Sequence, residues 1–408
     1  MSSFTAADRV SSAGDAIAVA QRLAAAFADQ AGVRDAARAL PHNEVEALKA
    51  SGLLSLSVPA ERGGLDAPAT VVAEVFRLLA HADPSLAQIP QSHYTFLEAL
   101  RLQGTATQHE FFYSLVQGGA LFANAQTERG PHAVNIDTTT LSGAGDEYAL
   151  TGRKFYSTGA LFADWLIVRA SLADGSGAEL SEPTASTPKA LAFIPRDAPG
   201  LQIVDDWDGM GQRTTASGTV TLDDVRVPAE HIVPFSPLFD QPTVYGAHAQ
   251  LLHAAIDVGI ATGSLAEGVR QAAKARPHFE AQVDSAAEDP TLIQVAGELT
   301  VTVRGAQALL AEAARRLDAA RADLTADSAA EASIAVAVAK VAAVRAALEA
   351  SNVLFELGGT RSASASANLS RYWRDARTHT LHDATRWKLQ HIGRYTLSGS
   401  RPPRHGQV

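Results

Sequence analysis

The 408-residue chain contains no cysteine. This absence excludes disulfide bonds, iron–sulfur clusters, zinc sites built on cysteine and thiol nucleophiles. Basic residues are also scarce relative to acidic ones, with 34 Lys and Arg against 44 Asp and Glu and a formal charge of −10. A nucleic-acid groove needs a net basic surface, so nucleic acid is not an expected partner.

Long apolar runs are missing too. Residues 332–348 come closest to the roughly 18 to 20 residues that a membrane span requires, but Lys340 and Arg345 interrupt them. The N-terminus lacks a basic segment followed by an apolar one, so no signal peptide is expected. We therefore expect a cytoplasmic protein with no membrane partner.

The residues that are present favour a packed globular protein of more than one unit. Apolar residues make up 46% of the chain and charged residues 19%, a balance typical of folded domains. The length predicts two or three packed units. The order of patterns predicts an α+β protein with a helical domain over 1–119, a central β domain over 120–235 and a helical domain over 236–408.

Each zone has its own signature. Pro41 and Gly52 bracket a short helix in the first zone. Short alternating segments separated by turns fill the second, with a Gly-, Ser- and Pro-rich stretch over 173–189 that predicts a mobile surface loop. Long alanine-rich segments with few helix breakers predict a helical bundle in the third. These segments are 243–274, 290–322 and 326–357, followed by a shorter expected helix over 381–393.

Four passages in order give the chain a family resemblance. They are PAERGGL at 59–65, AQTER at 125–129, TLDDVRVP at 221–228, and FELGGT at 355–360 followed by RYWRDAR at 371–377. Together they resemble the acyl-CoA dehydrogenase superfamily. The resemblance implies a fold with an N-terminal helical domain, a central β-barrel-like domain and a C-terminal four-helix bundle.

A narrower resemblance rests on further passages: NAQ at 124–126, FYSTGA at 155–160, DWDGMGQR at 206–213, RTHTLHD at 377–383 and PPRH at 402–405. They resemble the dibenzothiophene monooxygenases and the SfnB-type sulfur-acquisition oxidoreductases. This implies a monooxygenase that takes FMNH2 from a separate NAD(P)H-dependent flavin reductase and oxidises a small organosulfur compound with O2, through a flavin C4a-hydroperoxide. It also implies a homotetramer.

The segment after the arginine-rich passage decides between two activities. Acyl-CoA dehydrogenases commonly place a catalytic glutamate here, but residues 381–385 read LHDAT. A neutral imidazole can donate a hydrogen bond near pH 7, so His382 is the expected donor to the flavin peroxy group, with Asp383 orienting it or binding a flavin edge. Alternatively, the pair caps a nearby helix. An FAD-dependent acyl-CoA dehydrogenase or oxidase with a relocated base, such as Glu267, remains the competing function.

Two further histidines are candidates. By resemblance, His93 lines the substrate pocket and acts in catalysis, although a partly exposed helix histidine is an alternative. His379 is expected beside the cofactor. Its spacing of three from His382 resembles a metal pair, but no further ligands are apparent, so no metal site is expected.

The flavin environment is expected to draw on the β domain. By resemblance, amide, hydroxyl and aromatic groups at the strand ends contact the isoalloxazine ring; the candidates are Asn124, Thr127, Tyr156, Thr158 and Trp207, with Asn124 also a catalytic candidate. Ordinary packing is the alternative for Tyr156 and Trp207. Arg276 resembles an arginine that reaches the flavin phosphate from a neighbouring subunit, although it equally fits a solvated helix end.

Overall fold

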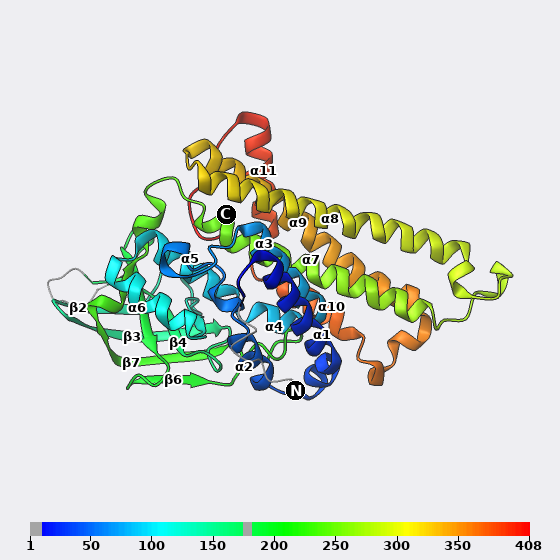
Figure 1. Cartoon of the computed structure of the whole chain (residues 1–408), viewed down its shortest axis with the longest axis horizontal. Coiled ribbons are helices and arrows are strands. Elements are labelled where there is room, and N and C mark those ends of the chain that lie inside the picture. The colour runs from blue at the N-terminus through cyan, green and yellow to red at the C-terminus, as the bar shows by residue number, and fades with distance from the viewer. Residues whose placement is uncertain (1–9, 174–181) are drawn as a thin grey trace.

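The computed structural model describes residues 10–173 and 182–408. Its elements follow the expected order of helices, sheet and helices (Figure 1). Residues 174–181 of the loop expected over 173–189 lie outside the described residues, and Lys189 begins a strand. No helix in the described part of the chain is both long and apolar enough to cross a membrane.

From residue 10 onward, the first zone contains the α-helices α1 (Ala13–Ala37), α2 (His42–Ala50), α3 (Ala69–Ala82), α4 (Pro84–Gln88), α5 (Gln91–Gln103) and α6 (Ala106–Gln117). The boundary between α3 and α4 shows why the chain turns there. The side chain of Asp83 accepts hydrogen bonds from the backbone N–H groups of Ser85 and Leu86, and Pro84 occupies the first turn of α4. Both features are typical helix starts.

The second zone forms one sheet. Its strands are β1 (Phe122–Ala125), β2 (Thr140–Ala144), β3 (Glu147–Ser157), β4 (Trp165–Leu172), β5 (Lys189–Pro195), β6 (Leu201–Val204), β7 (Gly218–Pro228) and β8 (Ile232–Pro234). The strand order is β6-β7-β3-β2-β4-β5-β8, and β1 adds in parallel to β4. The segment 205–217 between β6 and β7 leaves the sheet and reaches the helices.

The third zone is the expected bundle. Three long helices, α7 (Tyr245–Ala272), α8 (Pro290–Ala322) and α9 (Ala326–Gly358), run alongside one another away from the sheet (Figure 1). Two shorter helices follow, α10 (Ser370–His379) and α11 (Thr385–Ser398). The helix expected over 381–393 therefore begins at Thr385, and α10 covers the arginine-rich passage.

Helix α7 is the centre of the molecule, because it is buried along most of its length and packs against α3, α8 and α9. Two glycines permit the close approach of α3. A Cβ atom at Gly259 would lie 2.4 Å from the Cβ of Ala80, and one at Gly263 would lie 2.5 Å from the carbonyl oxygen of His81. A polar side chain on α7 is thus held inside the protein and needs a partner.

Candidate active site

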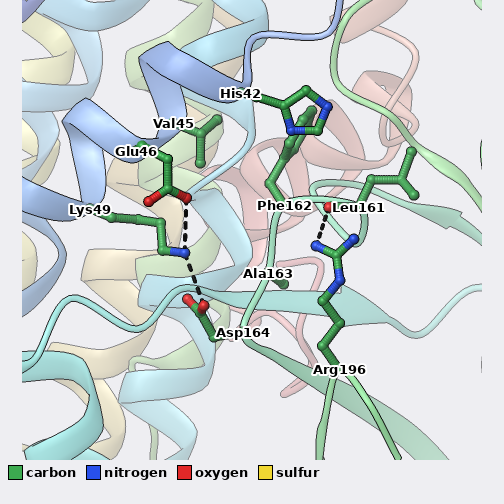
Figure 2. Close-up of a pocket in the computed structure, with 9 residues that line it drawn as sticks. All are labelled: His42, Val45, Glu46, Lys49, Leu161, Phe162, Ala163, Asp164 and Arg196. Atoms are coloured by element: carbon green, nitrogen blue, oxygen red, sulfur yellow. Dashed lines mark hydrogen bonds and ion pairs between the residues drawn. The ribbon is translucent and has the colours of Figure 1, made fainter.

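One cavity, of about 290 Å³, lies between α2 and the segment before β4 (Figure 2). Three of its polar side chains are paired with one another, because Lys49 lies 3.2 Å from Glu46 and 2.9 Å from Asp164. None of the expected site residues lines it. We therefore place the active site where the chemically competent side chains converge, and not in this cavity.

On the β-domain side, Tyr156 is the most conspicuous of the expected flavin contacts. It has a backbone φ of +56°, a region that non-glycine residues rarely occupy and that is enriched at functional sites. Its side chain is 46% exposed. Its ring lies edge-on to Trp207, with centroids 6.2 Å apart, and the guanidinium carbon of Arg129 lies 4.9 Å from its centroid. The structure thus brings Tyr156 and Trp207 together, with the tyrosine ring accessible.

Thr158 and Trp207 are tied into the segment 205–217. The Thr158 hydroxyl is 2.7 Å from that of Ser217, and the indole N–H of Trp207 donates to the carbonyl oxygen of Gln212 at 2.9 Å. The Trp207 N–H is therefore already engaged, and its ring is what remains for a flavin contact.

The same segment is anchored to α10. The backbone N–H of Gln212 donates to Oδ1 of Asp375 at 2.6 Å. Burial raises the pKa of Asp375 to about 7, although this backbone hydrogen bond opposes the rise. Asp375 lies one helical turn before His379, so the anchor links the β-domain candidates to the segment that carries His382.

Asn124 and Thr127 lie on and just after β1. Asn124 is half-buried and pairs in register with Ile167 of β4. Thr127 forms an isolated bridge with Phe155, whose N–H donates to the carbonyl oxygen of Thr127 at 2.7 Å. Both positions are fixed by backbone pairing, and the Asn124 amide is only half-buried.

The structure does not favour the expected catalytic role of His93. The residue is 0% exposed. Its Nε2 lies 2.8 Å from the carbonyl oxygen of Leu54, and its Nδ1 accepts from the N–H of Phe122 at 3.1 Å. Burial lowers its pKa to about 4, so both nitrogens of a neutral ring are used by the backbone. His93 fixes the start of β1, two residues before Asn124.

A cluster of buried polar residues converges on the other side, between α7, α9 and α10. His379 lies with Nδ1 2.5 Å from Oδ1 of Asp257, and its Nε2 is 3.2 Å from Nδ1 of His253. Lys340 completes it, with Nζ 2.7 Å from Oδ2 of Asp257. We call these four residues the relay cluster. Both His379 nitrogens are engaged within it, so neither is available to donate to or accept from a cofactor, and the expected place of His379 beside the cofactor stays a prediction.

His382 lies directly against the relay cluster. Its ring centroid is 3.9 Å from that of His253. Although His382 is itself exposed by surface area, dense protein surrounds it, and the resulting desolvation lowers its pKa to about 4. Asp383 opposes this shift, whereas His379 and Lys340 reinforce it. His382 is therefore a neutral imidazole near pH 7 and can donate a hydrogen bond.

Asp383 is enclosed but poorly satisfied. Its side chain is 4% exposed, with Lys388 Nζ at 3.2 Å and Lys340 Nζ at 3.9 Å. Burial raises the pKa of Asp383, but the two lysines outweigh burial and hold the pKa below its usual value. Within the described part of the chain, neither carboxylate oxygen has a well-formed hydrogen bond. The alternative role of a helix cap is not observed, because α11 starts after Ala384 without a side-chain cap.

Sequence reasoning missed three members of the relay cluster, and two signals could have found them. His253 and Asp257 are four residues apart, which places them on one face of a helix. Lys340 interrupts the most apolar stretch of the chain, and a lysine within a buried helix needs an anionic partner.

The competing base and the phosphate arginine lie away from this cluster. Glu267 accepts from Arg270 at 2.5 and 2.8 Å and from Gln271 at 2.6 Å, and about 21 Å of helix separate it from His253. Arg276 is exposed and follows α7 in the connection to α8, at the end of the bundle farthest from the sheet (Figure 1). Within one chain neither residue reaches His382.

The arrangement fits a polar, aromatic cofactor such as a flavin. Two enclosed hydroxyls on the converging segments, those of Ser157 and Thr378, lack partners among the described residues, and the Asp383 carboxylate has its lysines but no well-formed hydrogen bond there. Buried polar groups without partners are expected to meet a ligand or water. Over 10–173 and 182–408, no group of three or more His, Asp or Glu has the geometry of a metal site.

Comparison with known proteins places this geometry in a family. Three protein-family models match the sequence in order. They are the acyl-CoA dehydrogenase N-terminal domain over 16–118, the middle domain over 122–225 and the C-terminal domain over 251–387. Dibenzothiophene monooxygenase of Rhodococcus qingshengii is 33% identical over 404 residues, covering 95% of this chain and 94% of the relative.

Two further relatives bear on the cofactor. A probable FMNH2-dependent monooxygenase, SfnC of Pseudomonas putida, is 34% identical over 400 residues, covering 95% of this chain and 96% of SfnC. The crystal structure of FMN-bound TdsC from Paenibacillus sp. A11-2 is 30% identical with a TM-score of 0.90, covering 96% of this chain and 100% of TdsC. The chain therefore belongs to the acyl-CoA dehydrogenase family and, within it, groups with the dibenzothiophene monooxygenases.

Proposed function

We propose that this protein is a monooxygenase that uses reduced FMN and O2 to oxidise a small organosulfur compound. The observation that carries the proposal is the chemistry around His382. A dehydrogenase needs a free carboxylate base near the flavin, but Asp257 is bound by Lys340 and His379, and Asp383 faces two lysines. A neutral histidine takes the place of the base. The relatives named as monooxygenases support the same conclusion.

Each side of the site has a separate task. Reduced FMN, when bound, supplies the two electrons with which O2 reacts. On the helical side, His382 donates a hydrogen bond where negative charge develops on oxygen, and Asp383 orients the His382 loop through its lysines. On the sheet side, Asn124, Thr127 and Tyr156 hold the ring, and Thr158 and Trp207 support them from the segment 205–217.

The test is turnover with defined components. The purified protein is mixed with FMN, NADH, a flavin reductase and ¹⁸O2, and with a panel of sulfides, sulfoxides, sulfones and sulfinates. We expect one ¹⁸O atom in the sulfur product, which mass spectrometry detects. The reductase without this protein is the control. Reduction of bound FAD by an acyl-CoA thioester, without oxygen transfer to any sulfur compound, would instead establish the dehydrogenase.

A separate reductase implies that the protein takes up FMNH2 and releases FMN. We therefore expect a larger rise in melting temperature with reduced than with oxidised FMN under anaerobic conditions, because a ligand stabilises the state that it binds. A larger shift with FAD would point to the dehydrogenase.

We further propose a homotetramer in which Arg276 contacts the flavin phosphate of a neighbouring subunit. The support is the exposed position of Arg276 at the far end of the bundle together with the fork geometry of arginine, which suits phosphate oxygens. Light scattering gives the mass, and Arg276→Ala should weaken FMN binding without changing that mass. A monomeric mass would remove both claims. We retain units 1–119, 120–235 and 236–408 as the proposed domains.

A further inference from the structure

His253 stands between His382 and the interior of the bundle. It is 2% exposed, its Nδ1 lies 3.2 Å from Nε2 of His379, and its ring packs against that of His382 with centroids 3.9 Å apart. Its Nε2 has no hydrogen-bond partner among the described residues. One nitrogen of this ring is therefore committed to the relay cluster, and the other is free.

The contacts of His379 restrict where hydrogens can lie. Burial raises the pKa of Asp257, but His379 and Lys340 outweigh burial and hold Asp257 as a carboxylate. A carboxylate only accepts, so His379 carries a hydrogen on Nδ1 and donates it to Asp257. Its Nε2 then has two possible states. When it is bare it accepts from Nδ1–H of His253, and when it is protonated it donates to Nδ1 of His253.

The tautomer of His253 therefore follows the protonation of His379. With His379 neutral, His253 has its hydrogen on Nδ1 and its free Nε2 is an acceptor. With His379 protonated, His253 has its hydrogen on Nε2 and becomes a donor there. A proton added at one end of the pair thus changes the hydrogen-bonding character of the other end.

We propose that His253 is a relay residue that passes a proton between the reaction site beside His382 and an internal proton store formed by His379 and Asp257. To store a proton, Nε2 of His253 accepts it while the hydrogen on Nδ1 moves to Nε2 of His379. Each nitrogen that loses a hydrogen keeps the electron pair of the broken N–H bond. The reverse sequence returns the proton, and His253 is neutral before and after either event.

The surrounding charges explain why the proton rests on His379. The charged and titratable groups that act on His253 are Lys340 on α9, His379 on α10, His382 in the loop and Lys388 on α11. Asp257 pairs with His379 and Lys340, and Asp383 pairs with Lys388. Burial, followed by the cationic forms of its neighbours, keeps the pKa of His253 well below its usual value. Of the three histidines in this group, His379 is the one in direct contact with a carboxylate, at 2.5 Å, so an imidazolium is best stabilised there.

The relay rests on the proposed function, because it serves a reaction that forms water beside His382. FMNH2 provides two electrons and two hydrogens, one oxygen atom of O2 joins sulfur, and the other leaves as water. The overall reaction is balanced without the relay. The relay changes only which residue holds a proton between two proton-transfer steps. A store of this kind can hold the proton inside the bundle between events, because His253 and His379 are both buried.

The direct test is solid-state ¹⁵N NMR of histidine-labelled protein as purified, from pH 8 to pH 5.5. Ring nitrogens with and without hydrogen have distinct shifts, and His253→Asn and His379→Gln assign the two signals. We expect the hydrogen of His253 to move from Nδ1 to Nε2 as the pH is lowered, and this movement to be absent in His379→Gln. A His253 ring that keeps one tautomer throughout would overturn the relay, and this readout does not depend on turnover.

Two variants add a kinetic test. His253→Asn places an amide near the Nδ1 position but offers no second nitrogen, so we expect coupled turnover to fall by about 10²-fold, the lower end for general acid–base groups, with loss of one ionisation from the pH profile. His248→Asn is the matched control, because His248 is buried on the same helix but bonds to Arg321 at 3.0 Å, outside the relay cluster. Wild-type turnover and pH profile in His253→Asn would contradict the proposal. If the wild type oxidised none of the sulfur compounds, the proposed function would be wrong, whereas the NMR result would still decide whether His253 is a relay residue.

Discussion

Two of the buried lysines, Lys154 and Lys340, have different surroundings. Lys154 on β3 is 0% exposed, and its Nζ donates to the carbonyl oxygen of Gln126 at 3.1 Å, to Glu128 at 2.7 Å and to Asp137 at 3.1 Å. These three acceptors match the three hydrogens of an ammonium group. The cluster is saturated, and it fixes the segment after β1 to the sheet.

Lys340 on α9 is equally buried, but its surroundings are unsaturated. It lies 2.7 Å from Asp257 and 3.9 Å from Asp383, whose oxygens lack well-formed hydrogen bonds to the described residues. A fully satisfied polar cluster rigidifies the protein, whereas a partly satisfied one retains capacity to bind or transfer. The difference separates a structural brace from a reaction site more clearly than burial does.

Removing the saturated lysine should give the largest effect. Lys154→Met removes the cation from the largely buried Glu128 and leaves Asp137 with Arg169 alone. Breaking a buried pair in this way costs about 3 to 5 kcal/mol of unfolding free energy. Urea denaturation followed by circular dichroism measures the loss. Unchanged stability would show that Lys154 is not the brace of the β domain.

Removing the hydrogen-bond donor at the unsaturated cluster should affect chemistry and leave the fold intact. His382→Ala is expected to lower oxygenated product by about 10² to 10³-fold, while flavin oxidation continues and hydrogen peroxide replaces product. Product and peroxide are quantified in the same assay. His42→Ala is the matched control, because His42 lines the cavity of Figure 2. If His382→Ala still converted flavin oxidation into oxygenated product as the wild type does, His382 would not be the donor, and Asn124 would be the next candidate.

Acid should weaken the folded state through its buried histidines. Burial lowers the pKa of both His93 and His248 from 6.5 to about 4. Between about pH 6.5 and pH 4 these histidines are protonated in the unfolded chain but neutral in the folded chain. The unfolding free energy therefore falls as the pH decreases through this range. Each such histidine contributes about 1.4 kcal/mol per pH unit within this window.

The slope can be measured for one residue. Urea denaturation at pH 7 and at pH 5 gives the change in unfolding free energy for the wild type and for His93→Gln. We expect the unfolding free energy of the variant to depend less steeply on pH, by the amount that corresponds to the uptake of about one proton on unfolding. An identical slope would mean that His93 is protonated in the folded protein, against the contacts with Leu54 and Phe122.

An exposed pair gives the smallest effect. Arg226 lies 2.7 Å from Asp224, and both side chains are more than half exposed. Arg226→Ala should change the unfolding free energy by less than about 1 kcal/mol, because exposed pairs gain little in water. A loss as large as that of Lys154→Met would show that charge itself, and not burial, governs these clusters.

Sequence patterns predicted the long helices well because local signals define them. Alanine-rich stretches with few breakers gave 243–274, 290–322 and 326–357, close to the observed α7, α8 and α9. The helix expected over 381–393 begins instead at Thr385. In the structure the loop containing His382 and Asp383 is held by contacts with Lys340 and Lys388, and such distant contacts leave no local signal.

The sequence by itself determined the order of helices and strands and the absence of thiol chemistry, and its family resemblance implied that His382 and Asp383 stand where dehydrogenases commonly carry a glutamate. Periodicity, composition and motif order are local properties, so one chain suffices to read them. Only the tertiary structure decided which partners the other histidines meet. His93 and His253 both lie on buried helices, yet backbone groups take both nitrogens of His93, while His253 keeps one free beside His382. Which partners a buried imidazole meets depends on how distant helices pack, and that packing brings His379 against residues 126 and 122 positions away in the chain.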